Sequence, residues 1–252
     1  MTECALTVSG LTRRFGGLVA VNEVSLQLAR GELHAVIGPN GAGKSTLVNL
    51  LSGDLAPSAG SILFNGIEVS HLPADRRSRM GMGRSYQTAN IFAQFTALEN
   101  CRLAAQSRTP HALNWFRGAS SYPEIVREAR RALALVGLEA RGAIAAGHLS
   151  HGEQRQLEIA MCMATRPGVL LLDEPLAGMG AEESASMIAL LKTIAQDHAV
   201  LLIEHDMDAV FALARVLTVM VNGEILDSGA PEDVRANPRV QSAYLGAGDG
   251  HV

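Results

Sequence analysis

The sequence has little of what marks several large classes of protein. Aromatic residues make up 4% of its 252 residues, and the three cysteines are scattered: Cys4, Cys101 and Cys162. This spacing fits neither a metal site nor a disulfide framework, so we expect reduced thiols in a cytosolic protein. Because hydrophobic residues still make up 48% of the chain, we expect a core of mainly aliphatic side chains.

A strong excess of charge and long apolar runs are also lacking. The formal net charge is −4, which argues against a dedicated surface for nucleic acid. No apolar run approaches the ~20 residues of a membrane-spanning helix, and residues 1–4 do not open a secretory signal. If the protein works at a membrane, we expect it to do so through a partner. A chain of this length suffices for one large α/β domain with a substantial core.

One glycine-rich stretch dominates what is present. Residues 38–46, GPNGAGKST, follow an apolar run at 33–37 that predicts a buried strand, and they precede an apolar helix start. This order is typical of a phosphate-binding loop, because glycines let backbone N–H groups converge on an anion at a helix N-terminus. Lys44 can then reach the β- and γ-phosphates, and the hydroxyl of Ser45 can bind Mg²⁺. A glycine-rich turn with an incidental lysine is the alternative. Taken alone, the loop predicts only binding of a nucleoside triphosphate.

Hydrophobic patterns predict three parts around this loop. Alternation typical of antiparallel strands occurs early in the chain, at residues 5–11, 19–21 and 24–28 and around an Asn-Gly turn at 65–66. Strand signals then stop, and helices are predicted to begin at the Thr96 capping box and at Pro123. Aliphatic runs typical of buried parallel strands return at 169–173 and 199–203. The expected fold class is α/β: a phosphate-loop core with a parallel sheet, an N-terminal antiparallel β subdomain and an inserted helical subdomain.

Two carboxylates stand where one of these aliphatic runs ends. In α/β sheets, ligands bind at the carboxyl ends of the strands. Asp173 is therefore suited to hold the hydration shell of Mg²⁺, and Glu174 is suited to polarise an attacking water. A pair of solvated acids at a strand end is the alternative.

A helix start with a polar cap lies between these regions, in residues 149–154, LSHGEQ. Ser150 can cap the helix while Glu153 reaches back, as in a capping box. Ser150 and Gly152 could also offer a hydroxyl and N–H groups to an anion. An ordinary helix cap would explain the stretch if it stood alone.

The motifs occur together, in an order that resembles an ABC-type ATPase. They are residues 38–46, Gln87, 149–154, 169–174 and His205. The resemblance implies a single ATPase domain at 5–246, with a helical subdomain at about 88–165 and a tail at 247–252. The sequence is most similar to the ATP-binding subunits of branched-chain (hydrophobic) amino-acid uptake transporters, through residues 154–160, 177–179 and 236–246. The ATPases of urea uptake and lipopolysaccharide export remain alternatives.

This resemblance implies roles for individual residues around ATP and Mg²⁺. Phe15 would stack on adenine, and the phosphates would be surrounded by Asn40, Gly41, Gly43, Lys44, Ser45 and Thr46. Mg²⁺ would be held by Ser45, Gln87 and, through water, Asp173. Glu174 would be the general base, with Gln87 and His205 completing the catalytic group. A second ATP, held by the phosphate loop of another subunit, would contact Ser150, Gly152 and Gln154.

The same resemblance implies a nucleotide-sandwich dimer. The signature helix of one subunit would face the phosphate loop of a second ATPase subunit, which is either a paralogue or another copy of this chain. ATP would close this interface and hydrolysis would release it. Two residues depart from the usual pattern, since His151 stands where many signatures have glycine and Gly180 where an aspartate is common.

The expected function is ATP hydrolysis that drives an importer of branched-chain or other hydrophobic amino acids. Transport would pass through separate integral membrane permease subunits, supplied indirectly by a substrate-binding protein. The ATPase would lie peripherally at the cytoplasmic face of the inner (plasma) membrane, with Ile91, Phe92 and Phe95 receiving a coupling helix. The rivals are a soluble ABC-type ATPase acting on ribosomes or DNA and a phosphoryl-transferring kinase. The sequence shows no duplicated cassette or long coiled coil for the first, and residues 149–154 argue against the second.

Overall fold

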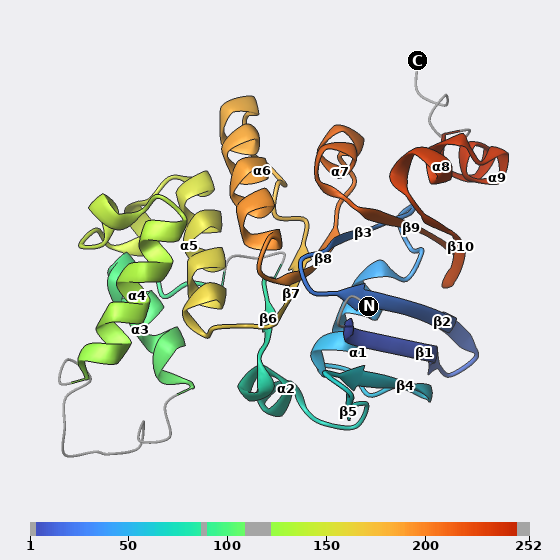
Figure 1. Cartoon of the computed structure of the whole chain (residues 1–252), viewed down its shortest axis with the longest axis horizontal. Coiled ribbons are helices and arrows are strands. Elements are labelled where there is room, and N and C mark those ends of the chain that lie inside the picture. The colour runs from blue at the N-terminus through green and yellow to red at the C-terminus, as the bar shows by residue number, and fades with distance from the viewer. Residues whose placement is uncertain (1–3, 87–89, 109–121, 246–252) are drawn as a thin grey trace.

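Two sheets and a set of helices build the described part of the chain, which comprises residues 4–86, 90–108 and 122–245 of the computed structural model (Figure 1). An antiparallel sheet has the strand order β2-β1-β4-β5, and a six-stranded sheet has the order β10-β9-β3-β8-β7-β6. The antiparallel sheet consists of β1 (Cys4–Phe15), β2 (Leu18–Ala29), β4 (Ala59–Phe64) and β5 (Ile67–Glu68). The larger sheet consists of β3 (Leu33–Ile37), β6 (Met82–Arg84), β7 (Val169–Asp173), β8 (Ala199–Ile203), β9 (Val216–Val221) and β10 (Glu224–Gly229).

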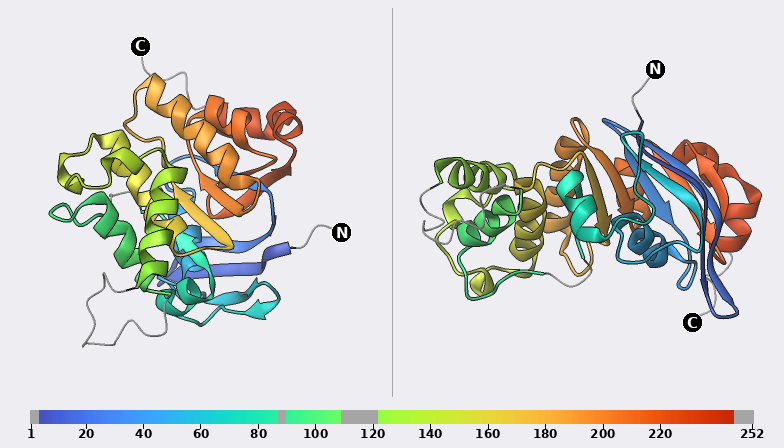
Figure 2. Two further views of the ribbon diagram at one scale, coloured as in Figure 1. Left: turned by 60° about the vertical axis from the view of Figure 1, so that its left-hand side comes forward. Right: turned by 90° about the horizontal axis from the view of Figure 1, so that it is seen from below.

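Helices lie on both sides of these sheets (Figures 1 and 2). They are α1 (Lys44–Ser52), α2 (Ala74–Met80), α3 (Ala97–Gln106), α4 (Pro123–Leu135), α5 (His151–Ala164), α6 (Ala181–Ala195), α7 (Met207–Leu213), α8 (Pro231–Ala236) and α9 (Pro238–Val240). The helices α3, α4 and α5 pack against one another at one end of the molecule. The expected α/β fold class, with a parallel core, an antiparallel sheet and inserted helices, is therefore confirmed.

The strand β3 lies at the centre of the six-stranded sheet and leads directly into the glycine-rich loop. It pairs in parallel with β8 on one side and with β9 on the other, and β7 pairs in parallel with β8. Every residue of β3, β7 and β8 is buried, as expected of parallel strands covered on both faces. Because parallel strands end at the same edge, the segments that follow β3, β7 and β8 lie near one another.

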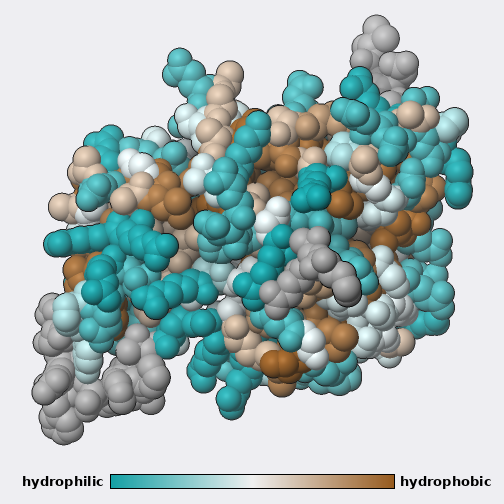
Figure 3. Space-filling view, viewed as in Figure 1, coloured by the Kyte–Doolittle hydropathy of each residue, from teal (hydrophilic) through white to brown (hydrophobic). Residues whose placement is uncertain are grey.

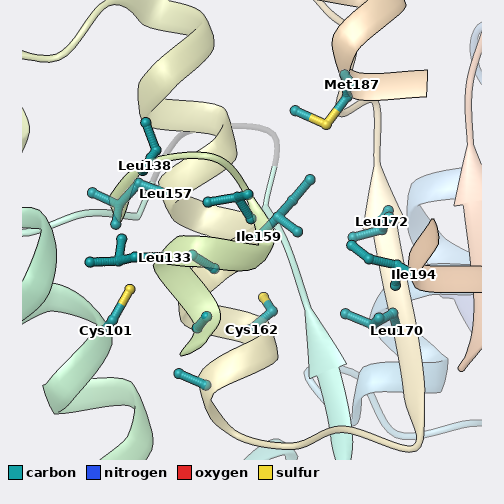
Figure 4. Close-up of a cluster of buried hydrophobic side chains, with 14 of the residues drawn as sticks. Cys101, Leu133, Leu138, Leu157, Ile159, Cys162, Leu170, Leu172, Met187 and Ile194 are labelled. Carbon is teal, nitrogen blue, oxygen red and sulfur yellow. The ribbon is translucent and has the colours of Figure 1, made fainter. Parts of the chain in front are cut away.

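The core is mainly aliphatic, as its composition predicts. The largest cluster joins the helices α3–α5 to one face of the sheet through residues that include Leu133, Leu157, Leu170 and Leu172 (Figure 4). A second cluster fills the space between the antiparallel sheet, α1 and the opposite face of the parallel strands. In the described residues, Phe64 is the one aromatic side chain among the buried hydrophobic residues. Both faces of the central strands are thus fixed by close packing, which gives the loops at their ends a rigid base.

Local sequence signals place several boundaries correctly. The Asn65-Gly66 turn joins β4 to β5, and both of its residues have positive φ, 47° and 76°. Thr96 and Ser150 form capping boxes at the starts of α3 and α5. The β1 and β2 strands are longer than the alternation predicts, because irregularities in their register interrupt the period of two.

On the face seen in Figure 3, hydrophobic side chains are exposed in separate patches among hydrophilic ones. No helix within the described ranges combines the length and apolar character needed to cross a membrane.

Candidate nucleotide site

An open pocket of about 530 Å³ lies where the glycine-rich loop meets the ends of β7 and β9. Its walls come from four separate parts of the chain, namely the β1–β2 turn, the loop after β3, the residue after β7 and the β9–β10 turn. They contain Phe15, Leu18, Val19, Ala20, Asn40, Gly41, Ala42, Gly43, Lys44, Ser45, Thr46, Glu174, Asn222 and Gly223. The structure thus brings together most of the residues that the sequence predicts for ATP.

The floor of this pocket is the N-terminus of α1. Its N-cap is Gly43, which carries no capping side chain and has a φ of 98°. The first N–H groups of a helix have no partners within the helix, so an anion can satisfy them here. A Cβ at Gly43 would overlap the carbonyl oxygen of Ala20. Glycine is therefore required here both by the conformation and by the close approach of β2.

Lys44 crosses the loop, and its ammonium is held by backbone carbonyl groups. Its Nζ donates to the carbonyl oxygen of Gly38 at 2.6 Å and to that of Pro39 at 3.0 Å. Burial lowers the pKa of Lys44, while the nearby carboxylates of Glu174 and Asp173 oppose this shift. A phosphate group would offer this cation a stronger partner than two neutral carbonyl groups.

Asp173 ends β7 as a buried carboxylate with an unused acceptor. Its side chain is 3% exposed, and its Oδ1 accepts no hydrogen bond from the described residues. Burial raises the pKa of Asp173. The nearby carboxylate of Glu174 raises this pKa further, whereas the cations Arg84 and Lys44 lower it. An unsatisfied buried acceptor is costly, so it indicates that a donor or a cation belongs there. Carboxylate, hydroxyl and water oxygens are the ligands that Mg²⁺ prefers, so Asp173 and Ser45 fit this ion.

Glu174 follows in an unusual backbone conformation. Its φ is 50°, in the left-handed region that costs roughly 1–2 kcal/mol for a residue with a side chain. Its N–H donates to the carbonyl oxygen of Ile203 at 2.9 Å, which ties it to the end of β8. This bond turns Glu174 into the pocket beside Lys44, while Asp173 remains part of the strand.

The predicted adenine contact, Phe15, is 43% exposed at the rim of the pocket. The guanidinium of Arg13 lies 4.6 Å from the centroid of its ring. The exposure expected from the neighbouring glycines is therefore observed, and one face of the ring is shared with a cation.

The turn between β9 and β10 forms one wall of the phosphate-loop pocket, and the sequence does not predict this position. The N–H of Gly223 donates to the carbonyl oxygen of Ala42 at 3.0 Å, and the carbonyl of Gly223 accepts from the N–H of Asn22 at 2.8 Å. The Asn-Gly pair predicts a hairpin turn, but nothing in its local sequence indicates contact with a loop 180 residues earlier. Only the order of the strands in the sheet brings it there.

Ser150 and Gly152, which the resemblance assigns to the ATP of another subunit, lie outside the phosphate-loop pocket. They line a second pocket of about 240 Å³, together with Met179 and the first turns of α6. The hydroxyl of Ser150 accepts from the N–H of Glu153 at 3.2 Å, and a Cβ on Gly152 would meet Oε1 of Glu183 at 2.5 Å. The start of α5 therefore lines a pocket that contains none of the residues of the phosphate-loop pocket.

Two further predicted residues, Gln154 and His205, line neither pocket. The side chain of Gln154 donates to the carbonyl oxygens of Leu149 at 3.1 Å and Ala146 at 3.4 Å, so it fastens the turn before α5. His205 follows β8 with a largely exposed ring. Gln87 lies outside the described residues, as does the predicted tail at 247–252.

Comparison with known proteins agrees with this geometry. The profile of the ABC transporter family matches residues 21–177. The chain therefore belongs to the ABC transporter family and is an ATP-binding cassette of the ATP-hydrolysing type. A second profile, described as branched-chain amino acid ATP-binding cassette transporter, matches residues 228–250.

Individual relatives extend over nearly the whole chain. The high-affinity branched-chain amino acid transport ATP-binding protein BraF of Pseudomonas aeruginosa is 42% identical, covering 98% of this chain and 99% of its own. The corresponding protein LivG of Escherichia coli is 40% identical with the same coverage. The ADP conformation of MJ1267, an ATP-binding cassette of an ABC transporter, superposes with a TM-score of 0.86 at 28% identity, covering 97% of this chain and 100% of that one.

Proposed function

We propose that this chain hydrolyses ATP between two ATPase subunits and thereby drives uptake of branched-chain or other hydrophobic amino acids. One observation carries the dimer: the phosphate loop and the Ser150–Gly152 helix start line two separate pockets of one chain. Each pocket has half of the groups needed to enclose a triphosphate. A second subunit supplies the missing half to each, so that ATP joins the two surfaces through charge-assisted hydrogen bonds.

Within one such site, the chain's own residues bind and orient the nucleotide. Phe15 stacks on adenine, Asn40, Gly41, Gly43 and Lys44 surround the β- and γ-phosphates, and Thr46 contacts the α-phosphate. Ser45, Gln87 and, through water, Asp173 would hold Mg²⁺, which would neutralise phosphate charge. The orphaned Oδ1 of Asp173 and the uncapped start of α1 support this assignment.

Hydrolysis then requires a water in line with the bond that breaks. The water oxygen attacks the γ-phosphorus while the bond to the β–γ bridging oxygen breaks, giving ADP and phosphate. Glu174 accepts the proton of the water, and His205 contacts the γ-phosphate. The left-handed turn at Glu174 supports this role, because it directs the carboxylate into the pocket beside Lys44.

The names of the relatives and the second matching profile support branched-chain amino acids as the transported substrate. Proteins that are 40–42% identical to this chain are named as high-affinity branched-chain amino acid transport proteins. The profile that matches residues 228–250 carries the same description. We therefore favour amino acids over urea or lipopolysaccharide. Uptake of radiolabelled leucine by the complex in proteoliposomes, with urea as the competing label, tests this choice.

A fixed aromatic loop supports docking to a membrane subunit at the cytoplasmic face. Phe92 and Phe95 are 54% and 42% exposed, and their rings stack with centroids 5.5 Å apart. The buried side chain of Asn100 holds this loop by accepting from the N–H of Phe92 at 2.8 Å and donating to its carbonyl at 3.1 Å. Ile91 instead packs partly into the helical core. Two exposed aromatic rings on a fixed backbone suit a partner's helix.

The Glu174→Gln variant tests the proposal as a whole. It should keep ATP binding, hydrolyse ATP roughly two to three orders of magnitude more slowly, and elute as a dimer in the presence of ATP. Phosphate release and size-exclusion chromatography measure these effects, with Glu232→Gln on α8 as the exposed control. Unchanged turnover would refute the assigned base, and a monomer with ATP bound would contradict the sandwich.

A further inference from the structure

Glu204 is a buried carboxylate that none of the roles above uses. It follows β8 and is 1% exposed. Its two oxygens accept from two different segments of the chain. Oε1 accepts from the N–H of Leu176 at 3.0 Å, and Oε2 accepts from the N–H of His205 at 3.1 Å.

These backbone groups offset the cost of burying the charge. Burial raises the pKa of Glu204, whereas hydrogen bonds from the backbone of Leu176, His205 and Asp206, together with the nearby His205 ring, act to lower it. Hydrogen bonds from N–H groups to a carboxylate are about twice as strong as neutral ones. Glu204 is thus a strong and directional link between two loops.

The two loops are those that carry Glu174 and His205. Leu176 lies two residues after Glu174, whose own N–H is bound by the carbonyl of Ile203. The segment 174–176 is therefore attached at both of its ends to residues 203–204. A left-handed residue persists only where its surroundings hold it, and these two bonds do so at Glu174.

We propose that Glu204 is a positioning residue for ATP hydrolysis, which sets Glu174 and His205 relative to each other through its two oxygens. The inference rests on the proposed function, because it matters only if Glu174 acts on the attacking water. It adds a residue that contacts neither the nucleotide nor the metal. A misplacement of about 1 Å in a reacting group can cost on the order of 100-fold in rate.

The geometry makes Glu204→Gln a selective test. A carboxamide has nearly the same shape but one acceptor oxygen, and its NH₂ group would face an N–H donor at the other position. The variant therefore loses one of the two links without leaving a cavity. The phosphate loop, α1 and Phe15 are untouched, so binding of ATP should be unchanged.

The experiment is a double-mutant cycle with Glu174→Gln. In the otherwise natural chain, Glu204→Gln should lower kcat about 10- to 100-fold while KM for ATP and the Kd of a fluorescent ATP analogue change less than about threefold. In the Glu174→Gln background the same substitution should change kcat less than about twofold, because the base through which it acts is gone. Glu204→Asp keeps both oxygens and the charge, and it should recover part of the lost kcat.

Two controls separate this role from general damage to the fold. Glu32→Gln replaces another glutamate whose pKa burial raises, at the opposite edge of the sheet before β3, and it should leave kcat unchanged. Amide hydrogen exchange at Leu176 or His205 should become faster in Glu204→Gln, which reports the lost link without reference to activity. If Glu204→Gln does not fold, Glu204→Asp carries the cycle alone.

The outcomes distinguish the two proposals. If Glu174→Gln turns over ATP at the natural rate, the proposed function fails, whatever Glu204 does. If Glu174→Gln is slow but Glu204→Gln leaves kcat unchanged, or lowers it equally in both backgrounds, the positioning role is overturned while the proposed function stands.

Discussion

Glu158 on α5 accepts a hydrogen bond from the backbone N–H of Tyr86 at 2.8 Å, 72 residues earlier in the chain. Arg155, one turn before it on the same helix, donates to the carbonyl oxygen of Tyr86 at 2.9 Å and pairs with Glu158 at 3.2 Å. Both backbone groups of Tyr86, two residues after the end of β6, are therefore held by α5, the helix that Ser150 caps. This clamp attaches the segment after β6 to the helix whose N-terminus lines the pocket of Ser150 and Gly152.

The contributions of Arg155 and Glu158 to the free energy of unfolding are expected to depend on each other. Breaking a buried ion pair by removing one partner costs about 3–5 kcal/mol, because it leaves an uncompensated charge. Arg155→Met and Glu158→Gln should each lower the free energy of unfolding in urea by about 3 kcal/mol. The loss in the double variant, Arg155→Met with Glu158→Gln, should be smaller than the sum of the two single losses. Simple additivity of the single variants would contradict this account.

Lys44→Ala is expected to act on nucleotide binding rather than on folding. Its ammonium bonds only to the carbonyls of its own loop in the described structure, so its loss removes a phosphate partner. Binding of a fluorescent ATP analogue should weaken at least about tenfold, or ~1.4 kcal/mol. Lys192→Ala, at an exposed position on α6, is the matched control. Equal affinities of the two variants would exclude the proposed contact.

Two glycines of the same loop should differ in how much alanine disturbs the fold. Both have positive φ, 80° at Gly41 and 98° at Gly43. A Cβ on Gly41 meets nothing within 4 Å, so Gly41→Ala should cost only the conformational strain of roughly 1–2 kcal/mol. Gly43→Ala adds a clash with the carbonyl of Ala20 and should unfold at clearly lower urea concentration. Equal midpoints would show that β2 does not restrict this position.

His34 should make stability depend on pH. It lies in the core on β3, with Nε2 at 2.8 Å from the hydroxyl of Thr218 and Nδ1 at 3.2 Å from the carbonyl of Gln27. Burial lowers the pKa of His34 from 6.5 to about 4. Between these values the unfolded chain binds the proton and the folded chain does not, so its contribution is complete above pH 6.5 and falls as the pH drops toward 4.

Urea unfolding at pH 7.5 and pH 5 measures this contribution. The loss attributable to His34 should be about 2 kcal/mol at pH 5, and His34→Gln should abolish that part of the pH dependence. Substitution of the exposed His71 by Gln should leave the dependence as it is. A parent and a His34→Gln variant with parallel pH profiles would rule out a neutral buried imidazole.

The sequence predicts those parts of the site that depend on neighbouring residues. The phosphate loop follows from glycine spacing, Asp173 from its place at the end of an aliphatic run, and the Ser150 cap from Glu153 three residues later. Each pattern reflects a local rule of backbone geometry or capping, and the structure agrees with the local prediction in each case.

The other parts depend on which strands become neighbours. The insertion of β3 between β8 and β9 joins segments about 165 to 185 residues apart, and no local pattern encodes this order. The same order brings Asn222-Gly223 onto the phosphate loop and Glu204 onto the segment after Glu174. His205 and Glu204 look alike in sequence, as polar residues after a strand, yet one is exposed and the other buried. Their difference arises only in tertiary packing.

The contact between the phosphate loop and the β9–β10 turn has a consequence for synthesis of the protein. Met220 and Gly223 close against Gly38 and Ala42, and a Cβ on Gly38 would overlap the carbonyl oxygen of Met220. A nascent polypeptide on the ribosome has its complete nucleotide-binding motif early, but it lacks this wall until translation passes residue 223. Premature termination between residues 206 and 219 would therefore release a product that contains every predicted catalytic residue and yet lacks this wall of its pocket.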